Sequence, residues 1–282
     1  MALDPSTVGV SSSPVVFEWD ADLAMLYALG VGAGVDDLAY TTDNSENLEQ
    51  KVLPTFPVLA VRGAFDPTGV LGQIGSFDMG MAVHGDQLVE VHAPIPPRGA
   101  VTTTHTVTGI FDKGSGAAIV VESASDSVET GKPLFTTTMT LFVRGAGGFG
   151  GDRGPSAAKV SQEGDPDITV TEATTDSQAL LYRLTGDKNP LHSDPAFAKR
   201  VGFERPILHG LCTYGFVGRA LVDKVCGGDD AKFGSMFARF SSPVVPGDVI
   251  TTSIWLNDDG AAFEASTHDG KTVLDRGVFQ YR

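Results

Sequence analysis

The two halves of the chain repeat one order of turn and strand residues, and this repeat strongly limits the folds open to it. In the first half, a segment rich in Pro and Gly precedes the β-branched run 101–107. In the second half, Pro243, Pro246 and Gly247 precede a similar run at 249–255. β-branched residues favour pleated, half-buried strands. We therefore expect two copies of one structural unit.

The parallel continues downstream of each run. Segments 112–116 and 257–260 are rich in Asp, Asn and Gly, which is typical of tight turns between antiparallel strands. Each half therefore predicts an antiparallel sheet. Its further strands are expected at 117–123 and 134–144 in the first half, and at 261–267 and 273–281 in the second.

Helical periodicity lies upstream of these strands in both halves. Asp20 is a predicted N-cap for a helix that ends at Gly30. Ser177 and Asp194 are predicted to cap two short helices, and a long apolar helix is expected at 211–225. One helix wrapped by an antiparallel sheet, occurring twice, is the simplest α+β architecture for this order.

The composition of the Gly-rich segment between the halves predicts a linker. Residues 145–167 hold seven Gly and two Pro and show little apolar periodicity. The expected organisation is a first repeat at 1–144, a linker at 145–167 and a second repeat at 168–282.

Charge and cysteine usage exclude several classes of function. The formal net charge is −15 and no basic run interrupts it, so we expect no nucleic-acid partner. The apolar stretch 206–225 contains charges and several Gly, which favours a buried helix over a membrane span. The two Cys lack metal-ligand spacing, so we expect no metal or cofactor. The N-terminus is unlike a signal peptide, which predicts a cytoplasmic protein.

The densest cluster of chemically useful residues is the segment 182–192. Gly186 and the Asn189-Pro190 pair predict a tight turn that brings Asp187, Asn189 and His192 together. A carboxylate and an imidazole can hold one water between them and move its proton near neutral pH. The structural alternative is an Asx-type turn in which Asp187 and Asn189 cap backbone groups and His192 caps a helix.

A second motif follows at 205–211. Gly210 stands at the predicted start of the apolar helix, where its amide and the positive end of the helix can stabilise an oxyanion. The structural alternative is that Gly210 only permits close packing of the helix on the sheet.

Segments 182–192 and 206–211 resemble the signature of the MaoC-like hydratases, in particular the R-specific 2-enoyl-CoA hydratase 2 group, which includes the hydratase part of peroxisomal multifunctional enzyme type 2. Segments 53–56, 83–87, 112–114, 147–151 and 238–247 extend the resemblance over nearly the whole chain. It implies a double hot-dog fold whose first repeat lacks the catalytic motif and helps form the acyl pocket. That agrees with the two-part pattern of the sequence.

The resemblance also implies residue roles. Asp187 and His192 would be catalytic, with Asn189 as a supporting polar group and the Gly210 amide as the donor to the carbonyl. Without the resemblance, His84 would be interpreted as a structural histidine and Lys113 as a turn lysine, while Phe240 fits a core residue and a substrate wall equally well. The substrate contacts implied are His84, Gly85, Lys113, Lys188, Pro190, Leu191 and Phe240.

The implied activity is hydration of trans-2-enoyl-CoA thioesters to (3R)-3-hydroxyacyl-CoA, in fatty-acid or steroid side-chain β-oxidation. Two rival functions stay open: thioester hydrolysis, because hot-dog folds also host thioesterases, and acyl-CoA binding without turnover. The exposed sheet edges expected in two such units favour a homodimer. The sequence leaves open the acyl chain length and which member of the pair is the immediate base.

Overall fold

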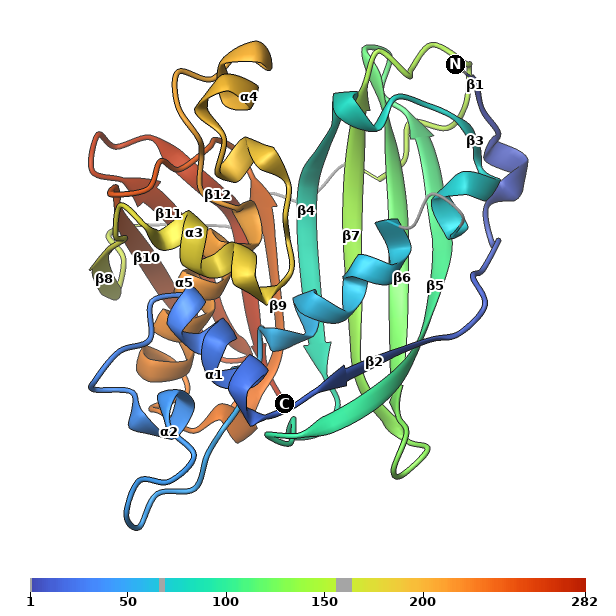
Figure 1. The fold of residues 1–282 in the computed structure, drawn as a ribbon. Helices are drawn as coiled ribbons and strands as arrows, with labels where there is room; N and C mark the ends of the chain where they lie inside the picture. The colour runs from blue at the N-terminus through green and yellow to red at the C-terminus, as the bar shows by residue number, and fades with distance from the viewer. Residues whose placement is uncertain (1, 66–68, 156–163) are drawn as a thin grey trace.

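The computed structural model describes residues 2–65, 69–155 and 164–282, and ten of its strands form one antiparallel sheet. The order across this sheet is β2-β5-β6-β7-β4-β9-β12-β11-β10-β8, so it divides into a first-half part and a second-half part (Figure 1). The strands are β2 (Val15–Trp19), β4 (Ala82–Val91), β5 (Gly99–Asp112), β6 (Gly116–Ser127), β7 (Pro133–Arg144), β8 (Ile168–Ala173), β9 (Phe233–Phe240), β10 (Val249–Asn257), β11 (Gly260–Thr267) and β12 (Thr272–Tyr281).

The two halves meet where β4 pairs with β9. Asp86 lies opposite Arg239 and Leu88 lies opposite Phe237 in this antiparallel pair. The strands expected from the β-branched runs are all present, with β5, β6 and β7 in the first half and β10, β11 and β12 in the second. β4 and β9 were not identified as strands by the sequence patterns, and they hold the sheet together.

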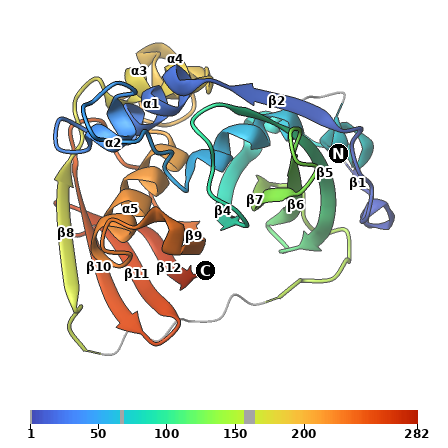
Figure 2. The ribbon, with the colours of Figure 1, turned by 90° about the horizontal axis from the view of Figure 1, so that it is seen from below.

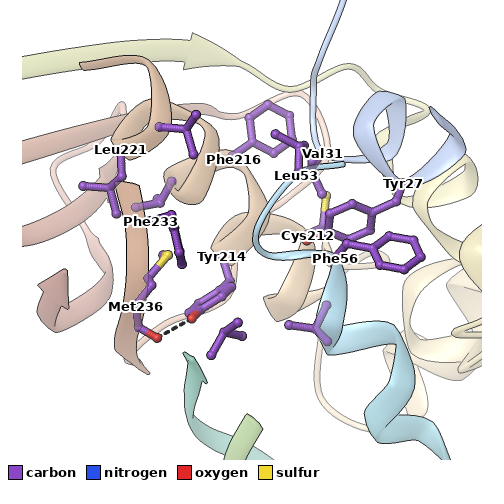
Figure 3. Close-up of a cluster of buried hydrophobic side chains, with 14 of the residues drawn as sticks. Tyr27, Val31, Leu53, Phe56, Cys212, Tyr214, Phe216, Leu221, Phe233 and Met236 are labelled. Carbon is purple, nitrogen blue, oxygen red and sulfur yellow. Dashed lines mark hydrogen bonds between the residues drawn. The ribbon is translucent and has the colours of Figure 1, made fainter. Parts of the chain in front are cut away.

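A long helix fills the concave side of the second-half sheet. It is α5 (Gly210–Lys224), which agrees with the expected helix at 211–225, and most of its residues are buried. Figure 3 shows Tyr214 and Leu221 of α5 in the core near Phe233 and Met236 of β9, while Phe216 of α5 lies beside Val31. The Tyr214 hydroxyl donates to the Met236 carbonyl oxygen at 2.5 Å, which ties the helix to the sheet.

The sequence repeat predicted that the first-half helix is wrapped by the first-half sheet, but this helix packs against the second half. Helix α1 (Ala21–Gly30) is present, and the Asp20 side chain accepts the Leu23 amide as its N-cap. It packs against α3 (Gln178–Tyr182) of the second half, where Gln178 Nε2 donates to the Gly30 carbonyl at 2.7 Å. Figures 1 and 2 show α1 and the short α2 (Leu38–Thr41) on that side of the molecule.

The first-half sheet is covered by a 3₁₀ helix from further along the chain. Helix η2 (Phe56–Phe65) contacts β5, β6 and β7, and η3 (Val70–Gln73) follows it. Each sheet therefore has a helical segment on its inner face, but the first is a 3₁₀ helix and the second an α-helix. Both halves thus combine an antiparallel sheet with one covering helix, and they differ in the type of that helix.

The first part of the expected linker is held against the β5–β6 turn. The Asp112 carboxylate accepts the amides of Gly114, Gly148 and Gly150, each at 2.8 Å. These amides lower the pKa of Asp112 to about 2. Residues 156–163 of the linker lie outside the described residues, and the boundaries at 144/145 and 167/168 stay a prediction. Over the described ranges, no helix is long and apolar enough to cross a membrane.

Candidate active site

The turn predicted at 186–192 is present: residues 186–189 join two 3₁₀ helices, η5 (Arg183–Thr185) and η6 (Pro190–His192). Gly186 has φ of 121°, a left-handed conformation that glycine adopts readily. Asp187 Oδ1 accepts the Asn189 amide at 3.1 Å, and Asn189 Oδ1 accepts the Leu191 amide at 3.0 Å. The capping proposed as the structural alternative is therefore present for Asp187 and Asn189, and it fixes the shape of the turn.

His192 has one ring nitrogen bonded and the other available. Its Nδ1 lies 2.9 Å from the carbonyl oxygen of Ile207. A carbonyl only accepts, so Nδ1 carries the proton and Nε2 of the neutral ring has a free lone pair. This is the tautomer that a general base needs.

His209 is a part of the site that the sequence patterns did not reveal. Its Nε2 donates to the Asp187 carbonyl oxygen at 3.3 Å, and its ring stacks on His192 with centroids 3.8 Å apart. The residue is 1% exposed, and its Nδ1 has no hydrogen-bond partner among the described residues. Its position just before Gly210, in the motif 206–211, was the available signal.

Burial keeps both imidazoles of this pair neutral. Desolvation lowers the pKa of His192, against the opposing effects of its bond to Ile207 and the negative charge of Asp187. Desolvation, reinforced by His192, lowers the pKa of His209 to about 3. A neutral His192 can accept a proton at physiological pH.

Gly210 begins α5, so its amide belongs to the helical turn that has no partner within the helix. A Cβ at Gly210 would lie 3.1 Å from the Phe240 ring, which shows how closely β9 approaches this amide. The Phe240 ring in turn lies 4.8 Å from the ring of His84 on β4. Both halves of the chain therefore contribute to the walls of the site.

His84 is held neutral by burial, which lowers its pKa to about 4 against the charge of Asp187. Its Nε2 is buried and has no hydrogen-bond partner in the part of the chain that the structure describes. Gly85 is the extra residue of a β-bulge between His84 and Asp86, which turns this end of β4.

The other predicted contacts lie on the catalytic turn and on the turn between β5 and β6. Lys188, Asn189 and Pro190 are exposed on the turn, and Leu191 is half-buried beside them. Lys113 Nζ donates to the Arg153 carbonyl oxygen and lies 5.6 Å from the Phe111 ring centroid. It therefore bonds to the linker, and its charge acts on the half-buried Asp86.

A cavity of about 370 Å³ opens beside the catalytic turn, and His192 forms part of its wall. Arg205 adds a cation to the same wall, with its guanidinium bonded to the Pro246 carbonyl oxygen at 3.0 Å. Solvent can reach the His192 imidazole through this cavity.

Asp187, His192 and His209 are also the described residues best placed for a metal ion. One ligand atom from each lies within 4.8 Å of the other two. A carboxylate and two imidazoles suit zinc. The same groups also form a complete acid/base site without an ion.

Comparison with known proteins covers both halves. The family description of the MFE-2 hydratase 2 N-terminal domain matches residues 17–145, and that of the MaoC like domain matches residues 156–276. The 3-hydroxyacyl-thioester dehydratase Y of Mycobacterium tuberculosis is 44% identical over 291 residues, covering 100% of this chain and 99% of that protein. The enoyl-CoA hydratase ChsH3 of the same organism is 40% identical, covering 95% and 94%.

The fold agrees with solved structures as well. The crystal structure of a MaoC-like dehydratase from Phytophthora capsici superposes with a TM-score of 0.88 at 31% identity, covering 100% of this chain and 98% of that one. The double hot-dog fold expected from the resemblance is thereby confirmed. The chain belongs to the MaoC-like hydratase family, in the group whose first half is an MFE-2 hydratase 2 N-terminal domain.

Proposed function

We propose that the protein hydrates trans-2-enoyl-CoA thioesters to (3R)-3-hydroxyacyl-CoA and also catalyses the reverse dehydration. The observation that carries this proposal is the arrangement around His192. Its unprotonated Nε2 lies beside the Asp187 carboxylate, and the Gly210 amide follows His209, whose ring stacks on His192. A base for water and a donor for a carbonyl oxygen are the two groups that this addition requires.

The addition begins at the thioester carbonyl. The Gly210 amide, at the positive end of α5, donates to the carbonyl oxygen and draws electron density away from C3. Water held by Asp187 and His192 gives up a proton as its oxygen bonds to C3 and the C2–C3 π electrons move toward the carbonyl. The enolate then takes a proton at C2 from the same pair, so the site ends in its starting state.

The proposal assigns the remaining parts of the substrate to the two halves. The acyl pocket is proposed on the first-half side, where the His84 ring contacts Phe240 and Gly85 forms a bulge in β4. Lys113, the turn 188–191 and Arg205 are the cations and backbone groups proposed to face the coenzyme A end. A local cation is needed there because the net charge of −15 repels phosphates.

A cytoplasmic homodimer is also part of this proposal. The sheet ends in two edge strands, β2 and β8, whose outer sides are not paired in the described residues. Such edges are potential sites of association. Sedimentation velocity at micromolar concentration should give a dimer, and a monomer at every concentration would contradict it.

The activity is tested with purified protein and a series of trans-2-enoyl-CoA thioesters of increasing length. Loss of the enoyl-thioester absorbance with only the (3R)-hydroxyacyl-CoA as product is the expected result. Release of free coenzyme A would indicate a thioesterase, and binding without turnover would indicate an acyl-CoA-binding protein.

A further inference from the structure

The inner face of the first-half sheet carries a band of buried polar side chains. This polar band occupies two adjacent rows of the register across β5, β6 and β7. Each member is at most 2% exposed. Its members are Thr103 and His105 on β5, Ser123 and Ser125 on β6, and Thr137 on β7.

The polar band separates two apolar clusters. On one side, Val107, Val121 and Met139 pack with residues of η3. On the other side, Val101 and Phe135 pack with residues of η2. Apolar side chains at these positions would have joined the two clusters into one core. Burying them would also have cost less desolvation free energy than burying the polar side chains that are present. Packing alone therefore does not account for its polarity.

Hydrogen bonds inside the polar band leave one nitrogen unused. Thr103 Oγ1 lies 2.8 Å from Ser125 Oγ, and His105 Nδ1 lies 2.8 Å from Ser123 Oγ. His105 Nε2 has no hydrogen-bond partner among the described residues, although such atoms are nearly always paired when buried. Because the Ser123 hydroxyl can donate or accept, His105 Nε2 can present either a proton or a lone pair.

The polar band is on the same face of the sheet as the active site. His84 lies opposite Leu141, and Gln87 lies opposite Met139 in the next row, which adjoins the band. Gln87 Oε1 is also buried without a partner among the described residues. At about 3.3 Å per residue and about 4.8 Å per strand, His105 is on the order of 20 Å from His84 along the sheet.

The segment over this face is a different kind of helix from its counterpart in the second half. Helix η2 is a ten-residue 3₁₀ helix, whereas α5 is a fifteen-residue α-helix. 3₁₀ helices of this length are uncommon because their hydrogen bonds have poorer geometry. An acyl group that enters past His84 would reach the polar band by displacing residues of η3 and η2 from the sheet.

We propose that the polar band is a subsite for an oxygen atom, a hydroxyl or a ketone, on the remote part of the acyl group, with His105 Nε2 as its main partner. This rests on the proposed function and narrows it. The preferred substrates are long or ring-containing enoyl-CoA thioesters that carry such an oxygen. Burial, which lowers the pKa of His105, keeps the ring neutral and able to take either hydrogen-bonding role.

The experiment compares a plain long-chain trans-2-enoyl-CoA with the same chain bearing a hydroxyl or a keto group at successive positions toward its end. kcat/KM is measured for wild type, His105→Leu and Ser123→Ala. His92→Leu is the matched control, because the His92 side chain is exposed and its ring nitrogen lies 2.9 Å from the Thr136 hydroxyl. Calorimetry with the saturated acyl-CoA counterparts gives Kd ratios that do not depend on turnover, and thermal midpoints identify any variant that fails to fold.

Wild type and His92→Leu should favour the best-placed oxygenated chain by about tenfold, which corresponds to one buried hydrogen bond. His105→Leu should bring this ratio near one, and Ser123→Ala should reduce it. Equal kcat/KM for both chains in wild type, or a preference that survives in His105→Leu, would overturn the subsite. If neither chain is hydrated, the proposed activity is wrong, and the Kd ratios decide the subsite by the same criteria.

Discussion

The imidazole rings of His192 and His209 stack with their centroids 3.8 Å apart and their planes 29° apart. His209 is also the N-cap residue of α5, immediately before the Gly210 amide, and it donates to the Asp187 carbonyl oxygen. One buried side chain therefore contacts the proposed base, the turn that carries the carboxylate and the start of the helix that carries the oxyanion donor. The relative placement of these groups depends on it.

Removing His209 should lower turnover without removing a reacting group. We expect His209→Ala to reduce kcat by about 100-fold, since a displacement of about 1 Å has an effect of that size. His209→Phe keeps a ring against His192 but loses the donor to Asp187, so its kcat should fall between those of wild type and His209→Ala. Steady-state kinetics from pH 5 to 9 check this. Wild-type kcat in His209→Ala would contradict the positioning role.

Changing the catalytic pair itself should have a larger effect. Asp187→Asn and His192→Gln should each lower kcat by at least about 10²- to 10⁴-fold, the usual contribution of one acid/base group. The double variant should be little worse than either single one, because the two act on one water. His268→Gln is the control, since this side chain is 66% exposed. Retained turnover in both single variants would refute the assignment.

Gly210→Ala tests how closely the substrate approaches the start of α5. Alanine keeps the amide, but its Cβ would lie 3.1 Å from the Phe240 ring and beside the carbonyl oxygen that the amide is proposed to bind. We expect kcat/KM to fall by at least about tenfold while the protein stays folded. Phe240→Leu in the same chain removes the ring contact. If that double variant regains full activity, the loss came from the ring and not from the substrate.

The strands and catalytic turn were the most predictable parts of this protein. β5 and β10 contain β-branched runs followed by turns rich in Asp, Asn and Gly, and the turn 186–192 is fixed by Gly186 and Asn189-Pro190. These signals come from residues close together in the sequence, so the elements can be predicted without knowledge of distant contacts. The Asp20 and Asp194 caps were predictable for the same reason, and both side chains accept backbone amides in the structure.

The features that the sequence did not reveal depend on distant contacts. The alternation in β4 and β9 is interrupted by polar or half-buried residues, and their pairing joins positions about half the chain apart. Helix α1 has apolar residues around its whole circumference, so its pattern does not show which half it packs against. His209 lies in an apolar helix start, and only the fold shows that its ring faces His192.

Chelation should leave the enzyme active. Asp187, His192 and His209 can supply three ligand atoms, but the addition of water needs only a base and a carbonyl donor, which the protein itself provides. Turnover after dialysis against EDTA should equal that of untreated protein. Added zinc should inhibit, because it would compete for the His192 lone pair and the Asp187 carboxylate. Loss of activity on EDTA treatment that zinc restores would contradict the metal-free mechanism.

Acidification should destabilise the fold in two overlapping pH ranges. Burial lowers the pKa of His84 to about 4 and that of His209 to about 3, below the value of about 6.5 in an unfolded chain. At pH values between the folded and the unfolded pKa, the unfolded chain binds more protons than the folded chain. The free energy of unfolding therefore falls as the pH drops below about 6.5. For Asp112 the folded pKa of about 2 lies below its ordinary 3.8, and its stabilising effect is lost only as the pH falls through that lower range.

Urea unfolding at pH 7.5, 6 and 5 checks the histidine range. For a group like His84, the expected loss between pH 7.5 and 5 is about 2 kcal/mol of the free energy of unfolding. His84→Leu cannot take up this proton, so its free energy of unfolding should change less over the same range. His268→Gln alters an exposed histidine and should keep the wild-type slope. Equal slopes for His84→Leu and wild type would show that His84 titrates alike in the folded and unfolded chain, and its burial would then not determine its charge.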